Sequence, residues 1–543
     1  MVPHISVSSV SRTTITRCFA GILILLGLVL PGMAKTGSDD TSRSLLILHT
    51  NDIHDHLRAD YDGIGGLPFV SGFVRSVRAE RNDVLVMDAG DVAEKGELVA
   101  RKVRGMTSSS LQRNSEMRDL EANRFDNDLT FKAMGRVGYD VWAPGNHDYD
   151  FGIDALYRFT ELAGMDIVCI NLLKEDGTPE FAPSVVYEVN GIRVGVIGAI
   201  RPRDRLSLDL EGTAQAMAVE ASRLKSETDV IFGLVHISNN NSKKIARSAT
   251  DIDVIIAGHS HEKTEQPVVV PETGTLIVQA GSYAQYVGHL ELEVNVKDRG
   301  IHSWEYRLVE MDHATIHPDL EMLEWVRQKE LELTPEAFRY ISWSPREVNY
   351  LEIGILAAEA LRRATGADIA LHNTAHIVRA TIHAGIHDLN TIYRTGGERG
   401  EFLVKVDLTG DEIRNYFLGL PMHGWLPSQW SGFHGSFDGG YFSSNLDPDR
   451  MYTVVMPERE WRQRFQRMVN QVKSNPDDYP VLNMPDRTLN VRDIDTKWIE
   501  AMSLLLEEYK KDRVGLLDAV LMIAEETGQT AILEQFLEQY SRY

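Results

Sequence analysis

Cysteine is almost absent from this chain of 543 residues, which contains only Cys18 and Cys169. Cys18 precedes an apolar run at 19–30, within an amino-terminal segment that reads as a removable export signal. If that segment is cleaved, Cys169 remains alone and no internal disulfide can form. A disulfide-stabilised scaffold and an all-cysteine metal site are therefore excluded, and stability must come from packing of an apolar core.

Basic charge is also in short supply. The chain carries 56 Lys and Arg against 79 Asp and Glu, which gives a formal net charge of −23. Such a surface repels polyanions, so a protein that coats nucleic acid is excluded. A small anionic substrate is not excluded, because a bound metal or a few arginines reverse the field locally. The expected partner is therefore a small molecule and not nucleic acid, and no pattern in the chain specifies an oligomeric state.

A hydrophobic run long enough to span a membrane is missing as well. The run at 19–30 is about a dozen residues long, whereas a bilayer needs roughly 20. Two arginines precede it, and Gly32 and Ala34 supply the small residues of a cleavage site. We therefore expect residues 1–34 to be a signal peptide cleaved near Ala34, a periplasmic or secreted mature protein, and no stable membrane anchor. A membrane-tethered form that keeps the apolar run is the alternative.

The length of the chain exceeds what one core supports and predicts at least two domains. Residues 44–312 alternate Val- and Ile-rich runs, which read as buried strands, with amphipathic helical patterns. This alternation is typical of a layered α/β domain. A polar stretch at 313–345 reads as a linker helix. Residues 346–543 carry a second α/β pattern and end in a helical tail.

Five of the predicted strands in residues 44–312 are each followed closely by Asp, Asn or His. These residues are Asp52 and His54 after LLILHT, Asp91 after VLVMDAG, Asn146, His147 and Asp150 after YDVWAP, His236 after VIFGLV, and His259 and His261 after DVIIAG. Ligands bind at the carboxyl ends of strands in α/β sheets. We therefore expect these side chains to meet at one place, although they lie far apart in the chain.

The residue types at these strand ends favour a metal centre. Imidazole, carboxylate and amide oxygen without thiolate suit Zn, Mn and Fe alike. The set is too large for one tetrahedral site and about large enough for two ions. Two metals about 3.5–4 Å apart clamp the oxygens of a phosphoryl displacement and produce hydroxide from bound water near neutral pH. The sequence therefore predicts two divalent metal ions and chemistry on phosphate esters.

The same motifs carry a family resemblance. In order and spacing, HTNDIHDHL, DAGD, GNHDYDFG, VHIS and GHSH resemble the five motifs of the calcineurin-like metallophosphoesterases, and more narrowly the secreted 5'-nucleotidase and UDP-sugar hydrolase family. The resemblance implies an N-terminal four-layer sandwich, with two mixed sheets flanked by helices, and a C-terminal α/β substrate domain. It also implies an exported phosphohydrolase, with nucleotides as the expected substrates, in which metal-bound hydroxide attacks phosphorus.

The resemblance further implies a role for each strand-end residue. One metal would be held by Asp52, His54, Asp91 and His261, and the second by Asp91, Asn146, His236 and His259, with Asp91 bridging. His147 would face the phosphate and stabilise the transition state or protonate the leaving oxygen, and Asp150 would orient His147. Asp148 would support the ligands from behind.

Residues 346–490 resemble the substrate domain of this family less closely. VKVDLTGDEIRNYF and PSQWSGFHGSF match its motifs, whereas NTAHIVR at 373–379 replaces its glycine-rich turn. The resemblance makes Asn373 and Arg379 candidate substrate contacts, with Arg379 binding the phosphate, and Phe433 is a candidate aromatic surface for the substrate. The base-stacking aromatic and the sugar-binding aspartate of the family are not recognisable in MYTVVMPEREWRQRF. The motifs expected for catalysis in residues 44–312 are thus all present, whereas the motifs expected for substrate specificity in residues 346–490 are altered.

Alternatives stay open on the sequence alone. The substrate could be a sugar nucleotide, a cyclic nucleotide or a sulfur ester carried on a protein, or the chain could bind metal without activity. Local roles also compete with functional ones. We expect His56 to be a loop histidine rather than a metal ligand, and Arg201 and Arg203 to face solvent rather than bind an anion. We expect Phe433 to pack locally rather than face a ligand, and Cys169 to be an inert core residue.

Overall fold

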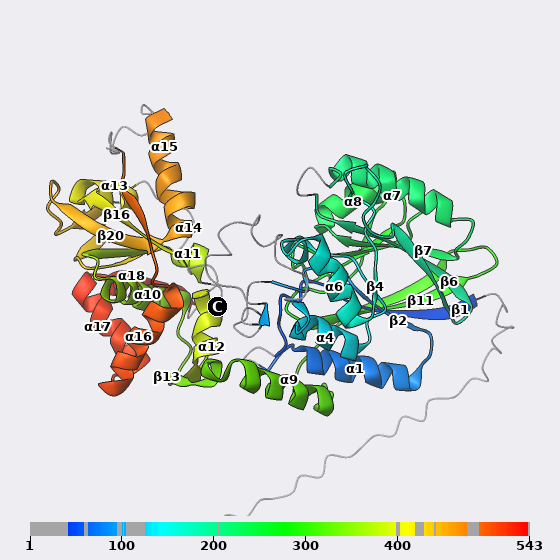
Figure 1. Cartoon of the computed structure of the whole chain (residues 1–543), viewed down its shortest axis with the longest axis horizontal. Helices are drawn as coiled ribbons and strands as arrows, with labels where there is room; N and C mark the ends of the chain where they lie inside the picture. The colour runs from blue at the N-terminus through cyan, green and yellow to red at the C-terminus, as the bar shows by residue number, and fades with distance from the viewer. Residues whose placement is uncertain are drawn as a thin grey trace, which may run out of the picture.

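The computed structural model of the chain contains two α/β units connected by a helix (Figure 1). The described residues are 42–58, 63–94, 100, 103–104, 125–202, 207–378, 380–397, 402–418, 428–438, 441–474 and 488–540. The predicted signal peptide at 1–34 lies outside these ranges. Within them, none of the helices combines the length and the hydropathy that crossing a bilayer requires.

The N-terminal unit is built on two six-stranded mixed sheets. The first has the order β12 (Ile301–Glu310), β11 (Tyr286–Asn295), β1 (Ser42–Thr50), β2 (Val84–Asp88), β3 (Val141–Trp142) and β4 (Asp166–Ile167). The second has the order β5 (Ser184–Val189), β6 (Ile192–Ile200), β7 (Val230–His236), β8 (Val254–Ala257), β10 (Leu276–Val278) and β9 (Val268–Val269). Strands β1 to β4 run parallel in the first sheet, as do β6, β7, β8 and β10 in the second. Antiparallel strands form the remaining edges.

The parallel strands are buried on both faces, which explains their continuous apolar sequence. Leu45 and Ile47 of β1 pack between the two sheets, whereas Leu46 and Leu48 face the helices outside. The outer face of the first sheet is covered by α1 (Leu67–Glu80), α4 (Leu129–Val137) and α6 (Ile153–Ala163), and that of the second by α7 (Leu210–Leu224) and α8 (Asn239–Ser248). The expected four-layer sandwich is confirmed.

One expected strand is shorter than its apolar sequence suggests. The run MDIVCIN at 165–171 predicts a strand, but β4 contains only Asp166 and Ile167. The backbone N–H of Val168 still bonds to Trp142 in the first sheet, whereas that of Ile170 bonds to Gly198 in the second. The chain passes from one sheet to the other here. The residues are buried and apolar because they cross the core, which is a tertiary effect that a local pattern does not reveal.

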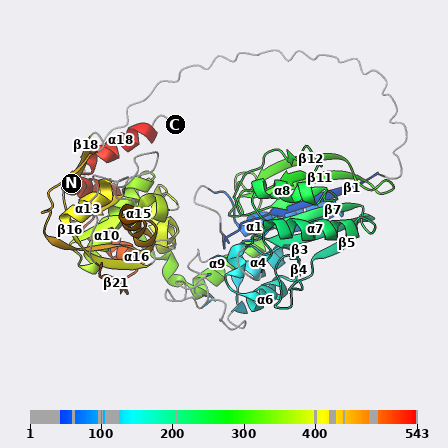
Figure 2. The ribbon, with the colours of Figure 1, turned by 90° about the horizontal axis from the view of Figure 1, so that it is seen from above.

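Helix α9 (Leu320–Leu333) connects the two units, as Figure 2 also shows. Its first turn is capped by Asp319, whose side chain accepts from the N–H of Met322. The helix packs against α1 and α4. Its buried Glu330 pairs with Arg58, which lies on the loop after β1. The helical pattern expected within 313–345 is therefore present and is tied to the N-terminal unit.

The C-terminal unit contains one main mixed sheet. Its order is β17 (Gln429–Ser431), β14 (Ile369–His372), β20 (Met451–Pro457), β16 (Leu403–Thr409) and β21 (Val491–Ile494). Two smaller antiparallel pairs are β13 (Tyr340–Ser344) with β15 (Gly385–Asp388), and β18 (Gly435–Asp438) with β19 (Tyr441–Ser444). The short helical segments between strands are η3 (Pro335–Phe338), α11 (Thr374–Ile377), α12 (Leu389–Ile392), η4 (Tyr393–Gly397), α14 (Glu458–Glu460) and η5 (Trp461–Phe465).

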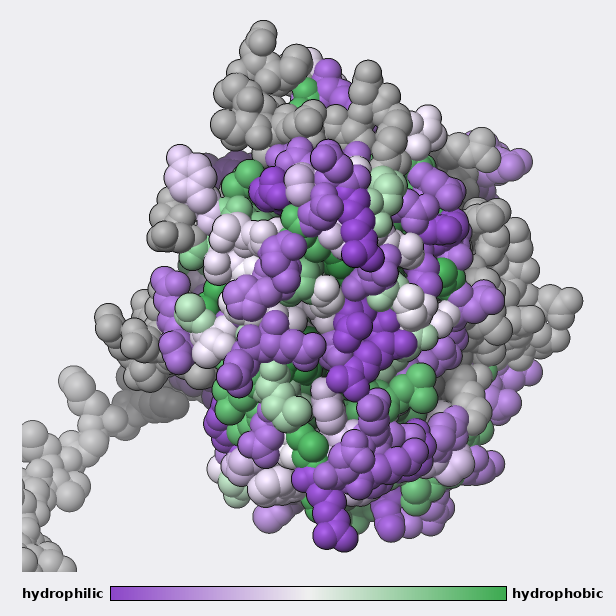
Figure 3. Space-filling model, turned by 90° about the vertical axis from the view of Figure 1, so that its left-hand side faces the viewer, coloured by the Kyte–Doolittle hydropathy of each residue, from purple (hydrophilic) through white to green (hydrophobic). Residues whose placement is uncertain are grey.

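Two helical layers cover the main sheet. One face packs against α10 (Tyr350–Thr365), α16 (Trp498–Lys511) and α17 (Leu516–Thr527), and the other packs against α13 (Gly410–Leu418) and α15 (Gln466–Ser474). Helix α13 begins with a capping box, because Thr409 Oγ1 accepts from the N–H of Glu412 and Glu412 Oε2 accepts from that of Thr409. The predicted helical tail comprises α16, α17 and α18 (Thr530–Tyr540). The surface turned away from the N-terminal unit is largely hydrophilic (Figure 3).

Candidate metal centre

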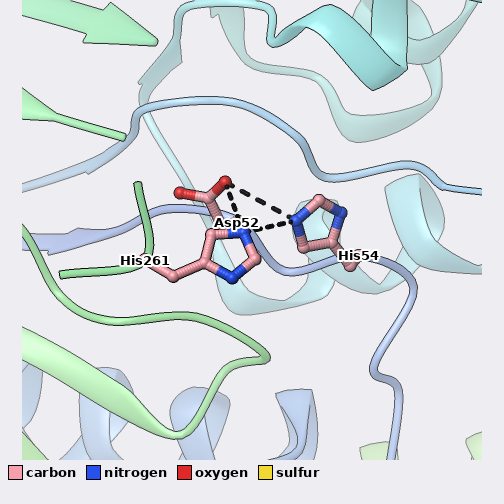
Figure 4. Close-up of side chains that lie close together, drawn as sticks. All are labelled: Asp52, His54 and His261. Carbon is pink, nitrogen blue, oxygen red and sulfur yellow. Dashed lines mark hydrogen bonds and ion pairs between the residues drawn. The ribbon is translucent and has the colours of Figure 1, made fainter. Parts of the chain in front are cut away.

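The first cluster of metal-ligating side chains comes from the loops after β1 and β8. Asp52 and His54 follow β1, and His261 follows β8 (Figure 4). The Nε2 atoms of His54 and His261 lie 3.0 Å apart, and Asp52 Oδ1 lies 3.2 Å from His261 Nε2 and 3.5 Å from His54 Nε2. One ligand atom from each residue falls within 4.8 Å of the others. The three side chains therefore converge on a single point.

A second cluster lies beside the first. It consists of Asp91 after β2, His236 at the end of β7 and His259 after β8. His236 Nε2 lies 3.0 Å from Asp91 Oδ2. The other ring nitrogen of His236, Nδ1, donates to the carbonyl of Ala89 at 2.7 Å. That bond fixes the tautomer with Nε2 unprotonated when the ring is neutral, so Nε2 is free to bind a cation.

The donor set of both clusters fits divalent metals. Nitrogen and carboxylate oxygen converge without thiolate, and this combination suits Zn, Mn or Fe. His236 Nε2 is buried, and it faces the carboxylate of Asp91 at 3.0 Å with no well-aligned hydrogen bond among the described residues. A buried polar atom of this kind needs a partner, and a cation supplies one. The observed side chains therefore match the two divalent metal sites that the sequence predicts.

The backbone at the clusters is strained. Five of the proposed ligands adopt the left-handed region with φ between 51° and 74°, namely Asp52, His54, Asp91, His259 and His261. Such conformations cost free energy for residues other than glycine, and they concentrate at functional sites. The loops therefore adopt an unfavourable geometry that turns each side chain inward, and this marks the clusters independently of their chemistry.

The segment after β3 holds the loop that carries Asp91. Asn146 and His147 begin the short helix α5 (Asn146–Tyr149). Asp148 Oδ2 accepts from the backbone N–H groups of Asp91 and Gly145 at 2.8 Å each. Gly145 is needed because a Cβ there would lie 2.1 Å from Asp91 Oδ1. Asp148 thus supports the ligands from behind, and Asn146 lies buried next to the loop of Asp91.

His147 and Asp150 form a pair at the edge of the clusters. His147 Nδ1 lies 3.5 Å from Asp150 Oδ2, and the ring of His147 is one-third exposed. Burial alone would lower the pKa of His147, but the carboxylates of Asp91, Asp150 and Glu94 outweigh it and raise the pKa to about 9. The exposed edge and the retained proton suit a side chain that meets a phosphate.

Electrostatic coupling distinguishes the histidines of the second cluster. Burial disfavours the charge of His236, but Asp91 and Asp52 outweigh it and raise its pKa to about 9. His259 behaves in the opposite way. Burial, together with the positive charges of His236 and Arg201, lowers its pKa to about 4. A neutral imidazole is the form that binds a cation, so His259 is ready to bind and His236 must first release a proton.

Sequence reasoning missed several residues that build this site. Glu94 lies 3.0 Å from His54 Nδ1 and 3.7 Å from His147 Nε2. Beneath it, the buried guanidinium of Arg104 pairs with Asp55 and Asp128 at 2.6 and 2.7 Å. A local signal existed for Glu94 and Asp55, which lie within three residues of predicted ligands. Arg104 had none, since an isolated arginine in a polar stretch normally faces solvent.

The candidate substrate residues of the C-terminal unit are placed differently. Asn373 follows β14 and is fully buried, with its side chain donating to Ser428 and its backbone N–H to Glu460. Phe433 is buried against Trp430 and Phe442, as the local-packing interpretation expects. Arg379 lies outside the described residues. The assignment of these three residues to substrate stays a prediction.

The other residues with competing interpretations are also placed. His56 is half-buried and belongs to neither cluster, and the centre of its ring lies 4.3 Å from that of Tyr283. Arg201 follows β6 with an exposed side chain, close enough to His259 to affect its pKa. Arg203 lies outside the described residues. Cys169 is buried, and burial raises the pKa of its thiol to about 11, which agrees with an inert core residue.

Comparison with known proteins agrees with this geometry. Residues 45–263 match the calcineurin-like phosphoesterase family. A 5'-nucleotidase of Vibrio parahaemolyticus is 25% identical over 516 residues, covering 82% of this chain and 86% of that protein. The structure of a 5'-nucleotidase precursor from Thermus thermophilus is similar with a TM-score of 0.63 and 23% identity, covering 86% of this chain and 97% of that one. The structure of the sulfate thiohydrolase SoxB of Thermus thermophilus gives a TM-score of 0.57 at 15% identity, covering 86% of this chain and 94% of that one.

The fold and the paired clusters define a metal-dependent phosphoester hydrolase. The N-terminal unit contains a calcineurin-like phosphoesterase domain over residues 45–263, and the chain as a whole is similar to 5'-nucleotidases.

Proposed function

We propose that this protein is an exported hydrolase of the 5'-nucleotidase type, which cleaves phosphate esters of nucleotides with two divalent metals. The observation that carries the proposal is the contact between the two ligand clusters, where Asp52 Oδ1 lies 4.0 Å from His236 Nε2. Adjacent sites can hold two cations against one phosphate group. A single isolated cluster would support metal binding but not this chemistry.

The proposed ligands divide into two sets. Asp52, His54 and His261 would hold one ion, and Asp91, His236 and His259 would hold the other. The family resemblance adds Asn146 to the second set and a second role for Asp91 in the first. When bound, the ions would supply Lewis-acid activation of the phosphate and of a nucleophilic water. Export is proposed from the predicted signal peptide, and residues 346–543 are proposed as the substrate domain.

The residues of the chain would perform the remaining steps. His147, with its partly exposed ring and raised pKa, would stabilise charge on the phosphate or deliver a proton to the leaving oxygen. Asp150 would hold the ring of His147 through Nδ1, which leaves Nε2 directed away from Asp150. The backbone N–H of His147 donates to Asp91 Oδ1 at 2.7 Å, so the same residue is tied to the proposed bridging ligand.

A second candidate function concerns the ester that is cleaved. Asn373 and Phe433 are both engaged inside the C-terminal unit, and this burial favours a substrate other than a nucleoside monophosphate. Sugar nucleotides, cyclic nucleotides and sulfur esters remain the candidates on this alternative. The metal centre would be the same, because the ligands lie in the N-terminal unit.

Activity against an ester panel tests the proposal. Purified protein would be assayed with nucleoside monophosphates, UDP-sugars, cyclic nucleotides and 4-nitrophenyl phosphate, and the same sample would be analysed for metal. We expect nucleoside monophosphates to be cleaved fastest, with two divalent ions per chain. If the protein cleaved the aryl phosphate but none of the nucleotides, the nucleotidase assignment would be rejected. Amino-terminal sequencing of the exported protein should begin near Lys35.

A further inference from the structure

Glu94 occupies a position between the first ligand cluster and His147. Its Oε2 lies 3.0 Å from His54 Nδ1, and its Oε1 lies 3.7 Å from His147 Nε2. His54 presents its other nitrogen, Nε2, to Asp52 and His261. The carboxylate of Glu94 is therefore on the opposite side of the imidazole from the metal position, and it reaches both the ligand and the histidine proposed for proton transfer.

The backbone of Glu94 is held from below by buried groups. Its N–H donates to Asp55 Oδ2 at 2.8 Å, and its carbonyl accepts from Arg104 Nη1 at 2.6 Å. Asp55 accepts two further bonds from the Arg104 guanidinium, at 2.7 and 2.6 Å, and one from Thr130 at 2.7 Å. Asp55, Arg104 and Thr130 are buried. A side chain that only balanced surface charge would not need such support.

We propose that Glu94 is a positioning residue that connects the metal centre to His147. One carboxylate oxygen accepts the Nδ1 proton of His54 and so orients Nε2 toward the metal, and the other oxygen holds the Nε2 edge of His147. The second role rests on the proposed function of His147, whereas the first does not. Carboxylates that accept from metal-binding histidines commonly tune metal affinity in this way.

The chemistry of a carboxylate differs from that of an amide at this position. A glutamine could accept from His54 Nδ1 through its oxygen, but its NH₂ group would then face His147 Nε2. The imidazole of His147 presents an N–H at the same edge, so the amide NH₂ and this N–H would be two donors facing each other without an acceptor. Glutamine should therefore preserve the contact with His54 and disturb the contact with His147, while alanine should remove both. This difference separates the two roles.

The first arm of the test measures metal binding without substrate. Apparent affinities for Zn²⁺ and Mn²⁺ would be determined by competition with a chelating dye for the parent, Glu94→Ala, Glu94→Gln and a matched control, Glu272→Gln, which changes an exposed ion pair with Arg247. Glu94→Ala should lose about 10–100-fold in affinity. Glu94→Gln and the control should stay close to the parent. Parental affinity in Glu94→Ala would overturn the proposal.

The second arm measures dependence on the leaving group. The kcat is measured for glycerol phosphate, which has a poor leaving group, and for 4-nitrophenyl phosphate, which has a good one, at saturating metal concentration. The first value is then divided by the second. This ratio should fall by about tenfold in Glu94→Gln, since only the poor leaving group needs a proton from a correctly held His147. An unchanged ratio would overturn the role at His147. If the parent cleaved no phosphate ester, the proposed function would fail, and the first arm would still decide the role at His54.

Discussion

Asp52 and His236 approach each other across the boundary between the two sheets of the N-terminal unit, with 4.0 Å between Oδ1 and Nε2. Asp52 follows β1 in the first sheet and His236 ends β7 in the second, and both side chains are fully buried. The metal centre is therefore assembled by the packing of one sheet on the other. A cation bound there would contact both halves of the sandwich, which has measurable consequences.

Replacement of Asp91 by Asn should remove both metal and activity. Asp91 lies 3.0 Å from His236 and accepts from the backbone N–H of His147, so its carboxylate contacts both the second ligand cluster and the residue proposed for proton transfer. We expect metal content below two ions per chain and a loss of more than about 100-fold in kcat/KM. Asp176→Asn, in an exposed turn, is the matched control. Unchanged turnover in Asp91→Asn would reject a two-metal mechanism.

Stability of the metal-free protein should depend on pH in a defined direction. Burial opposes the charge of His236, but Asp91 and Asp52 raise its pKa to about 9, and the pKa of His147 is raised to about 9 as well. Groups whose pKa is raised by folding stabilise the protein fully below their unfolded value near 6.5, and this stabilisation is lost as pH rises through about 9. With chelator present, the Tm should therefore fall between pH 6.5 and 9.

Metal affinity should change in the opposite sense over the same range. The neutral imidazole of His236 binds the cation, so bound protons compete with metal, and apparent affinity should rise with pH by up to about tenfold per unit for each such histidine. Thermal unfolding with and without chelator, together with dye competition at each pH, measures both effects. A flat Tm and a flat affinity between pH 6.5 and 9 would contradict the assigned charges.

Gly145→Ala should disturb the metal centre through sterics alone. A Cβ at this position would lie 2.1 Å from Asp91 Oδ1 and 2.2 Å from Asp91 N, and the backbone cannot move easily because Asp148 bonds to both segments. We expect a loss of about 10–100-fold in metal affinity. Gly212→Ala, at a helix position with a closest contact of 3.2 Å, is the control. The measurement is metal titration of both folded variants.

Much of the site could be predicted because its ligands follow buried strands. Apolar runs of Val and Ile identify β1, β2, β7 and β8, and the polar residues just after them must lie at one edge of parallel strands. These positions group Asp52 with Asp91 in the first sheet and His236 with His259 in the second. They do not show that the two edges meet, because that depends on how the sheets pack. The pairing of ligands came from the motif resemblance.

Other features depend on contacts between distant residues and had no local pattern. The left-handed backbone at His54 and His261 has no local sequence signal. The burial of Asn373 depends on Ser428 and Glu460, which are distant in the chain. The crossing after β4 is of the same kind. Sequence patterns indicate which residues prefer a core or a metal, but not which partner closes around them.

Arg104 is the buried cation among the groups that hold the backbone of Glu94, so its removal should destabilise the fold. Its guanidinium bonds to Asp55, to Asp128 and to the carbonyl of Glu94, with no exposed area. Removing it in Arg104→Ala leaves two buried carboxylates without a counter-charge, which should lower the free energy of unfolding by about 3–5 kcal/mol.

Arg247→Ala, which breaks an exposed pair with Glu272, should change the free energy of unfolding far less, because water and salt screen an exposed ion pair. Urea unfolding followed by fluorescence compares the two. Because Asp55 and Glu94 share this support, Arg104→Lys should retain charge but lose the forked geometry, and its unfolding free energy should fall between the parent and Arg104→Ala. Equal stability of Arg104→Ala and Arg247→Ala would mean that the buried charges are compensated by other groups.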